Sequence, residues 1–263
     1  MARFCSLFSS SSGNSTYFGT ASSGILIDAG VSCKRLCAAL INRDIEPEKL
    51  SAIFVTHSHT DHISGIKLFA SRYGIPVYCT AGTAAELEAA EAATGKFPLE
   101  IMPQTGTEAG GMEIKSFPVP HDTAQPCGYT VRFPDGRKAA IATDTGHMTD
   151  IILNEMKNCD LVMLESNHDV GMLQNGPYPY ALKRRILSPT GHLCNDDCAS
   201  AAVQLVKSGV TRLFLGHLST ENNIPGLAFE TTHAALTMSG ARLDIDYTLC
   251  VNKKENDGGI VLF

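Results

Sequence analysis

The sequence predicts an α/β fold in a single domain. Apolar runs rich in β-branched residues recur along the 263 residues, and each is followed by a loop and then by apolar residues at helical spacing. No composition shift, internal repeat or Pro/Gly-rich linker divides the chain, so we expect residues 1–263 to form one domain. The hydrophobic fraction of 44% and the charged fraction of 18% argue against disorder and against a coiled coil.

The individual elements follow from these apolar patterns. The predicted strands cover residues 24–28, 51–56, 75–78, 113–119, 128–133, 138–143, 161–165 and 212–216. The predicted helices cover residues 33–42, 64–73, 83–94, 196–208 and 227–238, and several of them end near a glycine. Strands follow one another without a helix between residues 110 and 143, which predicts mixed sheets rather than a repeating βαβ barrel.

The segment Thr-His-Ser-His-Thr-Asp-His, residues 56–62, carries three imidazoles and one carboxylate directly after a predicted strand. Because side chains alternate along an extended chain, His57 and His59 point one way, and Asp61 and His62 turn toward a neighbouring point. Such an arrangement suits two adjacent metal ions better than one. A polar surface loop is the alternative, but it does not explain why a third of the nine histidines gather here.

Two metal ions need further ligands from other parts of the chain. His121, Asp144 and His217 each follow the end of a predicted strand. Open α/β sheets place their ligand sites at the carboxyl ends of strands, so these residues are candidates to complete the site. Taken singly, each has an ordinary alternative: a strand-end histidine is often a solvated loop residue, and Asp144 in Thr-Asp-Thr-Gly can be a turn former.

The pattern His-x-His-x-Asp-His with later single His, Asp and His resembles the metallo-β-lactamase superfamily over nearly the whole chain. The resemblance implies a four-layer αβ/βα sandwich that holds two divalent metal ions, zinc or manganese. It assigns one metal to His57, His59 and His121. It assigns the other to Asp61, His62 and His217, with Asp144 bridging the two. It also places Asp28 behind a ligand histidine, as a carboxylate that orients the ring.

The implied chemistry is hydrolysis. A water that bridges two divalent ions loses a proton near neutral pH and becomes the attacking hydroxide, and Asp61 can steer it. The ions also neutralise oxygen charge that develops in the transition state. Flavodiiron reductases of this superfamily resemble His-x-Glu-x-Asp, whereas this chain has His59 at the central position, which disfavours a redox role.

Further segments, at residues 10–15, 165–169, 178–195 and 216–223, resemble the YycJ/WalJ-type branch of this superfamily. The resemblance implies a phosphodiesterase with 5′-to-3′ exonuclease-like activity, with nucleic acid, DNA in the first place, as the partner. A lactonase or a glyoxalase-II-type thioesterase would use the same metals and is the alternative enzyme. A non-catalytic metal-binding regulatory module is the alternative from another class, although the full ligand set argues against it.

Candidate substrate contacts lie outside the metal ligands. The backbone around Ser11, Gly13 and Asn14 can cradle a phosphate or can form a plain turn. Lys183 and Arg185 belong to the densest basic run, which suits a nucleic-acid backbone or a solvated helix face. His192, in a turn before a helix cap expected at Asn195, can reach a scissile phosphate or donate a proton to a leaving oxygen, which makes it a catalytic candidate beside Asp61.

Charge and composition limit the remaining possibilities. The net charge of −6 gives no global attraction for nucleic acid, so a phosphate-rich substrate requires a local positive site. Nine scattered cysteines without a CxxC pair predict reduced thiols, and the amino terminus matches neither a signal peptide nor a membrane anchor, so we expect a cytoplasmic protein. We expect Cys194 and Cys198 to serve packing, and His147 and His168 to be surface residues.

Overall fold

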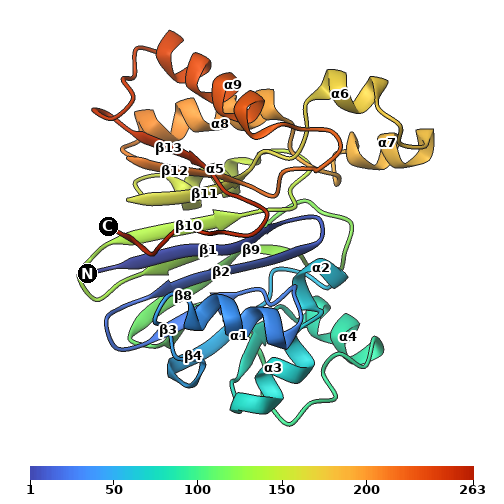
Figure 1. The fold of residues 1–263 in the computed structure, drawn as a ribbon, viewed down its shortest axis with the longest axis vertical. Helices are drawn as coiled ribbons and strands as arrows, with labels where there is room; N and C mark the ends of the chain where they lie inside the picture. The colour runs from blue at the N-terminus through green and yellow to red at the C-terminus, as the bar shows by residue number, and fades with distance from the viewer. The chain divides into compact units, whose positions relative to one another are not determined.

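The computed structural model describes all 263 residues, and the chain packs into two compact units. Unit 1 contains Met1–Ser116, Thr123–Arg137 and Lys253–Phe263. Unit 2 contains Phe117–Asp122 and Lys138–Asn252. Both termini belong to unit 1, where β14 (Val261–Leu262) pairs antiparallel with β1 (Arg3–Ser10) (Figure 1).

Unit 1 holds a seven-stranded sheet in the order β14-β1-β2-β3-β4-β5-β6. Its remaining strands are β2 (Gly13–Gly19), β3 (Gly24–Ile27), β4 (Leu50–Phe54), β5 (Val77–Cys79) and β6 (Leu99–Ile101). Pairing is antiparallel from β1 to β3 and parallel from β3 to β6. The carboxyl ends of β3 and β4 therefore lie at the same edge of the sheet, which brings the residues after them together.

Helices pack against this sheet through an apolar core. They are α1 (Cys33–Ile41), the 3-10 helix η1 (Pro47–Lys49), α2 (Thr60–Ile63), α3 (Ile66–Tyr73) and α4 (Ala81–Ala89). The Ser32 side chain accepts from the Arg35 N–H and starts α1. Leu36 and Phe69 from the helices pack with Ile53 from β4 in the same core. Unit 1 also contains β7 (Thr107–Ala109), β8 (Met112–Pro118, whose last two residues belong to unit 2) and β9 (Cys127–Arg132).

Unit 2 is built on four parallel strands in the order β13-β12-β11-β10. They are β10 (Lys138–Ala142), β11 (Leu161–Glu165), β12 (Arg212–Gly216) and β13 (Thr248–Val251). The helices of this unit are α5 (Asp150–Met156), α6 (Val170–Asn175), α7 (Tyr180–Ile186), α8 (Asn195–Lys207) and α9 (Pro225–Met238). Leu164, Leu205 and Leu236 belong to one apolar core that joins the strands to α8 and α9.

The α/β class and every strand and helix proposed from the sequence are confirmed, with boundaries shifted by a few residues. The largest shift concerns the helix expected over residues 83–94, since α4 ends at Ala89 and Glu91 takes a left-handed conformation. No helix is both long and apolar enough to cross a bilayer. All nine cysteines are free thiols, as their scatter predicted.

The hairpin of β1 and β2 has no counterpart among the sequence-based predictions. Every residue of β2 is buried, so its polar and apolar residues do not alternate between a wet and a dry face. Of the serines in this segment, Ser9, Ser10 and Ser15 are buried in the sheet, where Ser15 donates from Oγ to the Asp28 carbonyl. Hydrogen bonding inside the sheet thus compensates for burying a polar strand.

Candidate metal and catalytic site

Unit 1 presents its metal-type donors from the loop that leaves β4 and enters α2. His57 is buried, His59 is half-buried at the N-cap of α2, and Asp61 and His62 lie in the short helix itself. His59 has an extended backbone, and the chain turns into the helix at Thr60.

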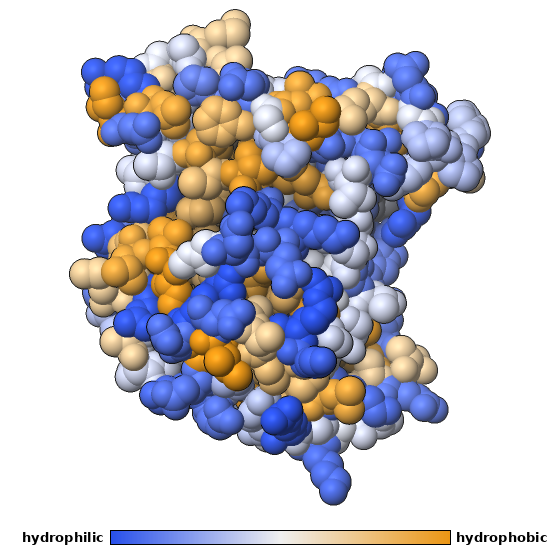
Figure 2. Space-filling model, in the orientation of Figure 1, coloured by the Kyte–Doolittle hydropathy of each residue, from blue (hydrophilic) through white to orange (hydrophobic).

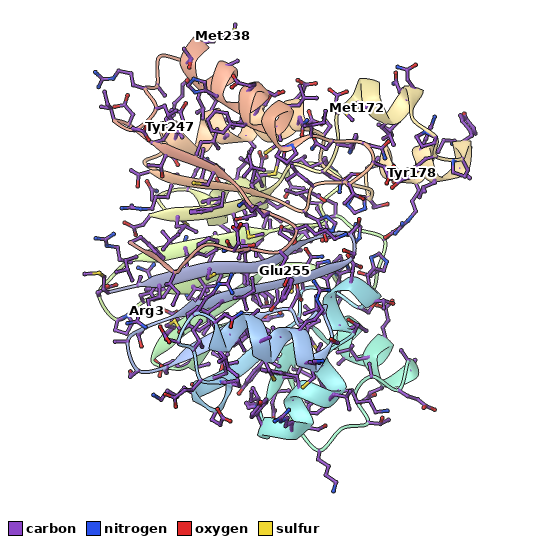
Figure 3. The ribbon with its side chains drawn as sticks, viewed as in Figure 1. Arg3, Met172, Tyr178, Met238, Tyr247 and Glu255 are labelled. Atoms are coloured by element: carbon purple, nitrogen blue, oxygen red, sulfur yellow. The ribbon has the colours of Figure 1, made fainter.

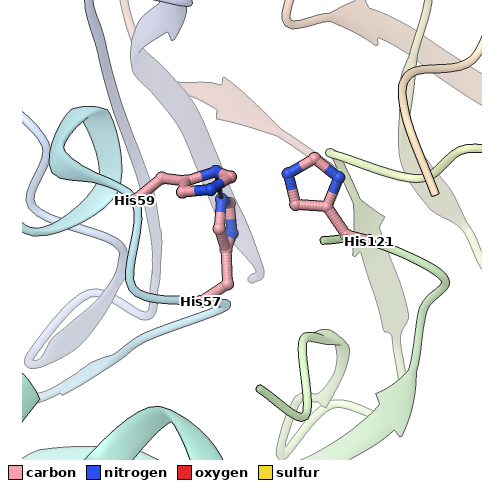
Figure 4. Close-up of side chains that lie close together, drawn as sticks. All are labelled: His57, His59 and His121. Atoms are coloured by element: carbon pink, nitrogen blue, oxygen red, sulfur yellow. Dashed lines mark hydrogen bonds between the residues drawn. The ribbon is translucent and has the colours of Figure 1, made fainter. Parts of the chain in front are cut away.

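The imidazoles of His57 and His59 turn ring nitrogens toward each other. Nε2 of His57 lies 3.1 Å from Nδ1 of His59, and the two rings are nearly perpendicular, at 82° (Figure 4). On the other side of the His57 ring, Nδ1 lies 3.0 Å from the Thr56 hydroxyl. The ring is therefore held from behind, with Nε2 as its outward donor atom.

The Asp28 carboxylate contacts both ends of this loop, at Thr56 and at His62. It follows β3, adopts a left-handed backbone with φ of 62°, and is buried. One carboxylate oxygen accepts from the Thr56 N–H at 2.8 Å, and the other lies 2.7 Å from Nδ1 of His62. Because Nδ1 of His62 donates to Asp28, Nε2 carries the ring lone pair, which is the form that binds a metal.

The candidate phosphate loop is the tip of the β1–β2 hairpin. Ser11 and Ser12 are exposed at the turn, and Gly13 pairs with Ser10 across the hairpin. Asn14 points the other way: its Nδ2 lies 3.0 Å from Nε2 of His62 and 3.2 Å from an oxygen of Asp61. Asn14 therefore contacts the donor loop, while Ser11 and Gly13 lie at the turn of the hairpin.

Unit 2 presents its donors at the carboxyl ends of three adjacent parallel strands. Asp144 follows β10, Glu165 ends β11 and His217 follows β12. Their donor atoms, together with those of His192, all lie within 4.8 Å of one another. Asp144 Oδ1 lies 3.4 Å from Nδ1 of His217 and 3.5 Å from Nδ1 of His192. Asp144 and His217 have left-handed φ values of 56° and 55°, a strained conformation that is common at functional sites.

Glu165 is a member of this cluster that the sequence analysis did not single out. It is fully buried, and one oxygen lies 2.9 Å from Nδ1 of His192 and 2.8 Å from Nδ1 of His217. The other oxygen accepts from the backbone N–H groups of Thr145 and Leu193. Burial raises the pKa of Glu165, but the charge of His192 and hydrogen bonds from both imidazoles outweigh it and lower the pKa to about 2. Glu165 is thus a carboxylate that orients two histidines.

His121 and His192 complete the donors of unit 2. His121 lies in the loop after β8, where Nδ1 is 3.1 Å from the Gly191 carbonyl and Nε2 is 3.8 Å from Asp144 Oδ1. Burial lowers the pKa of His121 against the opposing charge of Asp144, so the neutral, ligating form predominates at neutral pH. The His192 side chain keeps 15% of its surface exposed, so this ring is in reach of solvent.

The two basic substrate candidates make contacts inside unit 2. Lys183 donates from Nζ to the backbone carbonyls of Gln174 and Gly176, at 2.9 and 2.7 Å. Arg185 forms a two-pronged ion pair with Asp122, the residue after His121. In these conformations Lys183 closes the end of α6, and Arg185 fixes α7 beside the His121 loop.

A cluster of buried amides supports the loops that carry Glu165 and His217. Asn223 Nδ2 lies 2.9 Å from the Ser166 carbonyl and 3.1 Å from the Asn167 carbonyl, while Asn167 donates to the carbonyl of the strained His217 at 2.9 Å. Asn195 joins the cluster through Asn223, and Cys194, not Asn195 as expected, caps α8. The Asn195 side chain hydrogen-bonds to Asn223 in this cluster, and Asn195 is therefore the first residue of the helix and not its cap.

Removing Asn223 should destabilise this part of unit 2. The Asn223→Ala variant removes the donor to the buried Ser166 carbonyl and the acceptor of the buried Asn195 amide, and we expect the free energy of unfolding to fall by about 3 kcal/mol. Asn154, exposed on α5, is the matched control, and its alanine variant should stay within about 0.5 kcal/mol of the parent. Urea denaturation measures both. Equal stability of the two variants would show that the amide cluster contributes nothing.

His168 is not the surface residue that the sequence predicted, whereas His147 is exposed as expected. His168 is 1% exposed, and neither ring nitrogen has a hydrogen-bond partner. Burial lowers its pKa to about 4, so the ring is neutral. The buried cluster at residues 166–168 extends the end of β11, which a sequence pattern of mixed polar residues does not distinguish from a surface loop.

The donor chemistry fits divalent cations. Neutral imidazole nitrogens and carboxylate oxygens are the ligands of zinc, manganese and related ions. A carboxylate, carbonyl or hydroxyl group contacts one ring nitrogen of His57, His62, His121, His192 and His217 and can fix the tautomer. The chain therefore carries the histidine and aspartate set of a divalent-metal site.

Comparison with known proteins gives a consistent family. Residues 24–218 match the model of the "Beta-lactamase superfamily domain". The chain is 37% identical over 250 residues to the exodeoxyribonuclease WalJ of Streptococcus pneumoniae, which covers 93% of this chain and 92% of the relative. It is also 37% identical over 241 residues to the exodeoxyribonuclease YycJ of Bacillus anthracis, with 90% of each chain covered.

Solved structures agree on the fold. The metallo-β-lactamase fold protein YhfI of Bacillus subtilis superposes with a TM-score of 0.71 at 17% identity, covering 99% of this chain and 98% of the other. Zn²⁺-bound PqqB of Methylobacterium extorquens superposes with a TM-score of 0.74 at 15% identity, covering all of both chains. At these identities the likeness concerns the fold, and it confirms the sandwich class that the sequence predicted.

Proposed function

This chain belongs to the metallo-β-lactamase superfamily, in its WalJ/YycJ-type branch, and from that premise we propose that it is a metal-dependent exodeoxyribonuclease. One observation carries the proposal: identity of 37% over nine-tenths of two proteins named exodeoxyribonuclease, in a chain that has the donor residues of a metallohydrolase. Cleavage from the 5′ end toward the 3′ end is part of the proposal.

The proposed cofactor is a pair of divalent cations, zinc or manganese. We assign His57, His59 and His121 to one cation, and Asp61, His62 and His217 to the other, with Asp144 shared. When bound, such cations lower the pKa of coordinated water and neutralise charge on phosphodiester oxygens. The support from unit 1 is the pair of facing His57 and His59 nitrogens, and the support from unit 2 is the cluster around Asp144.

The remaining residues are assigned by what they can do at a phosphodiester. Asp61 orients the attacking water, and His192, held at Nδ1 by Glu165 and partly exposed, protonates the leaving oxygen. Ser11, Gly13 and Asn14 are proposed to contact phosphate at the hairpin tip, and Lys183 and Arg185 to supply positive charge near α7. The nine free thiols support a reducing cytoplasm as the place of action.

An end-labelling experiment tests the activity. The purified protein, loaded with zinc or manganese, is incubated with single- and double-stranded DNA and RNA labelled at either end, and in parallel with a lactone and a thioester. We expect stepwise release of nucleotides from the 5′ end of DNA. Binding should weaken steeply as salt rises, because phosphate contacts release counterions. Turnover of the lactone or thioester alone would contradict the nuclease and identify a small-molecule hydrolase. Metal binding without turnover of any substrate would favour a non-catalytic regulatory module.

Asp28 offers a test of the ligand assignment away from the substrate. In the Asp28→Ala variant the His62 ring loses the acceptor that fixes its tautomer, and we expect metal affinity to fall by about 10- to 100-fold. Competition with a chromophoric chelator measures the affinity. Asp44, exposed in the loop after α1, is the control, and its alanine variant should bind metal as the parent does. Unchanged affinity in Asp28→Ala would remove His62 from the ligand set.

A further inference from the structure

The segment of α6, the loop at residues 176–179 and α7 forms an arm of unit 2 (Figure 1), and its loop is restrained by two prolines and a lysine contact. Pro177 and Pro179 restrict the backbone on both sides of Tyr178. The Lys183 ammonium bridges the carbonyls of Gln174 and Gly176 and so ties α7 back to the end of α6. A loop fixed in this way presents its side chains with little conformational entropy left to lose.

The arm presents an aromatic ring to solvent with a cation beside it. Tyr180, at the start of α7, is 76% exposed, and the guanidinium carbon of Arg184 lies 5.9 Å from the ring centroid. Figure 3 marks Met172 on α6 and Tyr178 in the adjoining loop, and in Figure 2 the surface over this arm is mostly blue and pale, with little orange. An exposed ring with an arginine beside it, on a mostly polar surface, has the composition that binds single-stranded nucleic acid, where aromatic rings stack on bases and arginine adds cation–π attraction.

The other end of α7 abuts the catalytic residues of unit 2. The backbone N–H of His192 donates to the Ile186 carbonyl at 3.0 Å, and the Arg185 side chain pairs with Asp122, the neighbour of His121. Tyr180 precedes Ile186 by six residues, so helix geometry separates the two by about 9 Å. At about 3.4 Å per stacked nucleotide, that length corresponds to roughly three nucleotides.

We propose that Tyr180 and Arg184 form a stacking platform for a base of single-stranded DNA, about three nucleotides from the bond that is cleaved. The inference rests on the proposed function and adds a substrate contact to it. Aromatic rings accept every base because every base has a π-face, and an adjacent arginine contributes both cation–π attraction and charge toward the phosphates. The Arg185 guanidinium pairs with Asp122 and the Lys183 ammonium contacts backbone carbonyls, whereas Arg184 is the basic residue of α7 that lies over the ring.

Substrate length and a conservative variant make the test specific. In Tyr180→Ala we expect the KM for an eight-nucleotide single strand to rise by about 5- to 100-fold, whereas Tyr180→Phe keeps the ring and should match the parent. Bis(p-nitrophenyl) phosphate and a dinucleotide are too short to reach the platform, so all three proteins should cleave them with equal kcat/KM. Arg184→Ala should raise the same KM, while Lys67→Ala, which removes one exposed charge on α3, should not.

Binding measured without turnover separates this inference from the proposed function. Fluorescence anisotropy of a labelled single strand is recorded in an Asp144→Ala background, with and without Tyr180→Ala. Weaker binding on loss of the ring supports the platform even if the parent protein cleaves no DNA, an outcome that would end only the nuclease assignment. Equal binding and equal KM overturn the platform. A dimeric parent protein together with a monomeric Tyr180→Ala variant that binds DNA unchanged would also overturn the platform, because the ring would then contact a second copy of the chain.

Discussion

The Asp144→Ala variant is expected to lose hydrolysis altogether, by at least about 10³-fold in kcat, and to bind less metal. The Asp144 carboxylate is buried and lies within 4 Å of nitrogen atoms from three histidines, His121, His192 and His217. Loss of one fixed electrostatic group at a reacting centre already costs about 10²- to 10³-fold, and Asp144 is in addition the proposed shared ligand. Steady-state kinetics and metal analysis of the dialysed protein measure both effects.

A structural explanation for that loss is tested separately. Asp144 adopts a left-handed backbone, so alanine at this position carries some strain, and the melting temperature of the variant must be recorded. Asp196→Ala, which removes an exposed carboxylate from the first turn of α8, is the matched control and should keep full activity. A folded Asp144→Ala protein with normal turnover and normal metal content would exclude Asp144 as the shared ligand.

The His192→Ala variant should lose about 10²- to 10⁴-fold in kcat on DNA while it keeps its metal content. The ring is held by Glu165 at Nδ1 and is partly exposed, which suits proton donation to a leaving oxygen. A p-nitrophenolate leaving group needs little help from an acid. On bis(p-nitrophenyl) phosphate the same variant should therefore lose only about 10-fold.

The comparison of the two substrates gives this prediction its specificity. An equal loss on DNA and on the activated ester would assign His192 to substrate positioning or to the metal, not to proton transfer. His147→Ala serves as the control, because His147 is exposed and its Nδ1 contacts only the Pro189 carbonyl. That variant should retain the parent kcat on both substrates.

The sequence was sufficient for the residues whose position follows from strand topology. Asp144 and His217 follow two strands of unit 2, and His57 follows a strand of unit 1; in each sheet the carboxyl ends of parallel strands meet at one edge. Glu165 ends β11, between β10 and β12, and the same argument could have identified it. A charged residue that closes a fully apolar strand was the available signal.

Other features depend on tertiary contacts that a single sequence does not display. Strand β2 is fully buried and mixes polar with apolar residues, so it lacks the alternation that marks a strand. His168 lies in a polar segment and is buried only because α8 and the loop before α9 enclose the end of β11. The roles of Lys183 and Arg185 likewise follow from Gly176 and Asp122, partners that no local pattern predicts.

An anomalous-scattering map from crystals soaked in zinc or manganese tests the central claim most directly. We expect two strong peaks per chain, one ligated by His57, His59 and His121 and the other by Asp61, His62 and His217, with Asp144 contacting both. Peaks at other residues, or none at these seven side chains in a metal-saturated crystal, would contradict the proposed metal centre and the hydrolytic mechanism built on it.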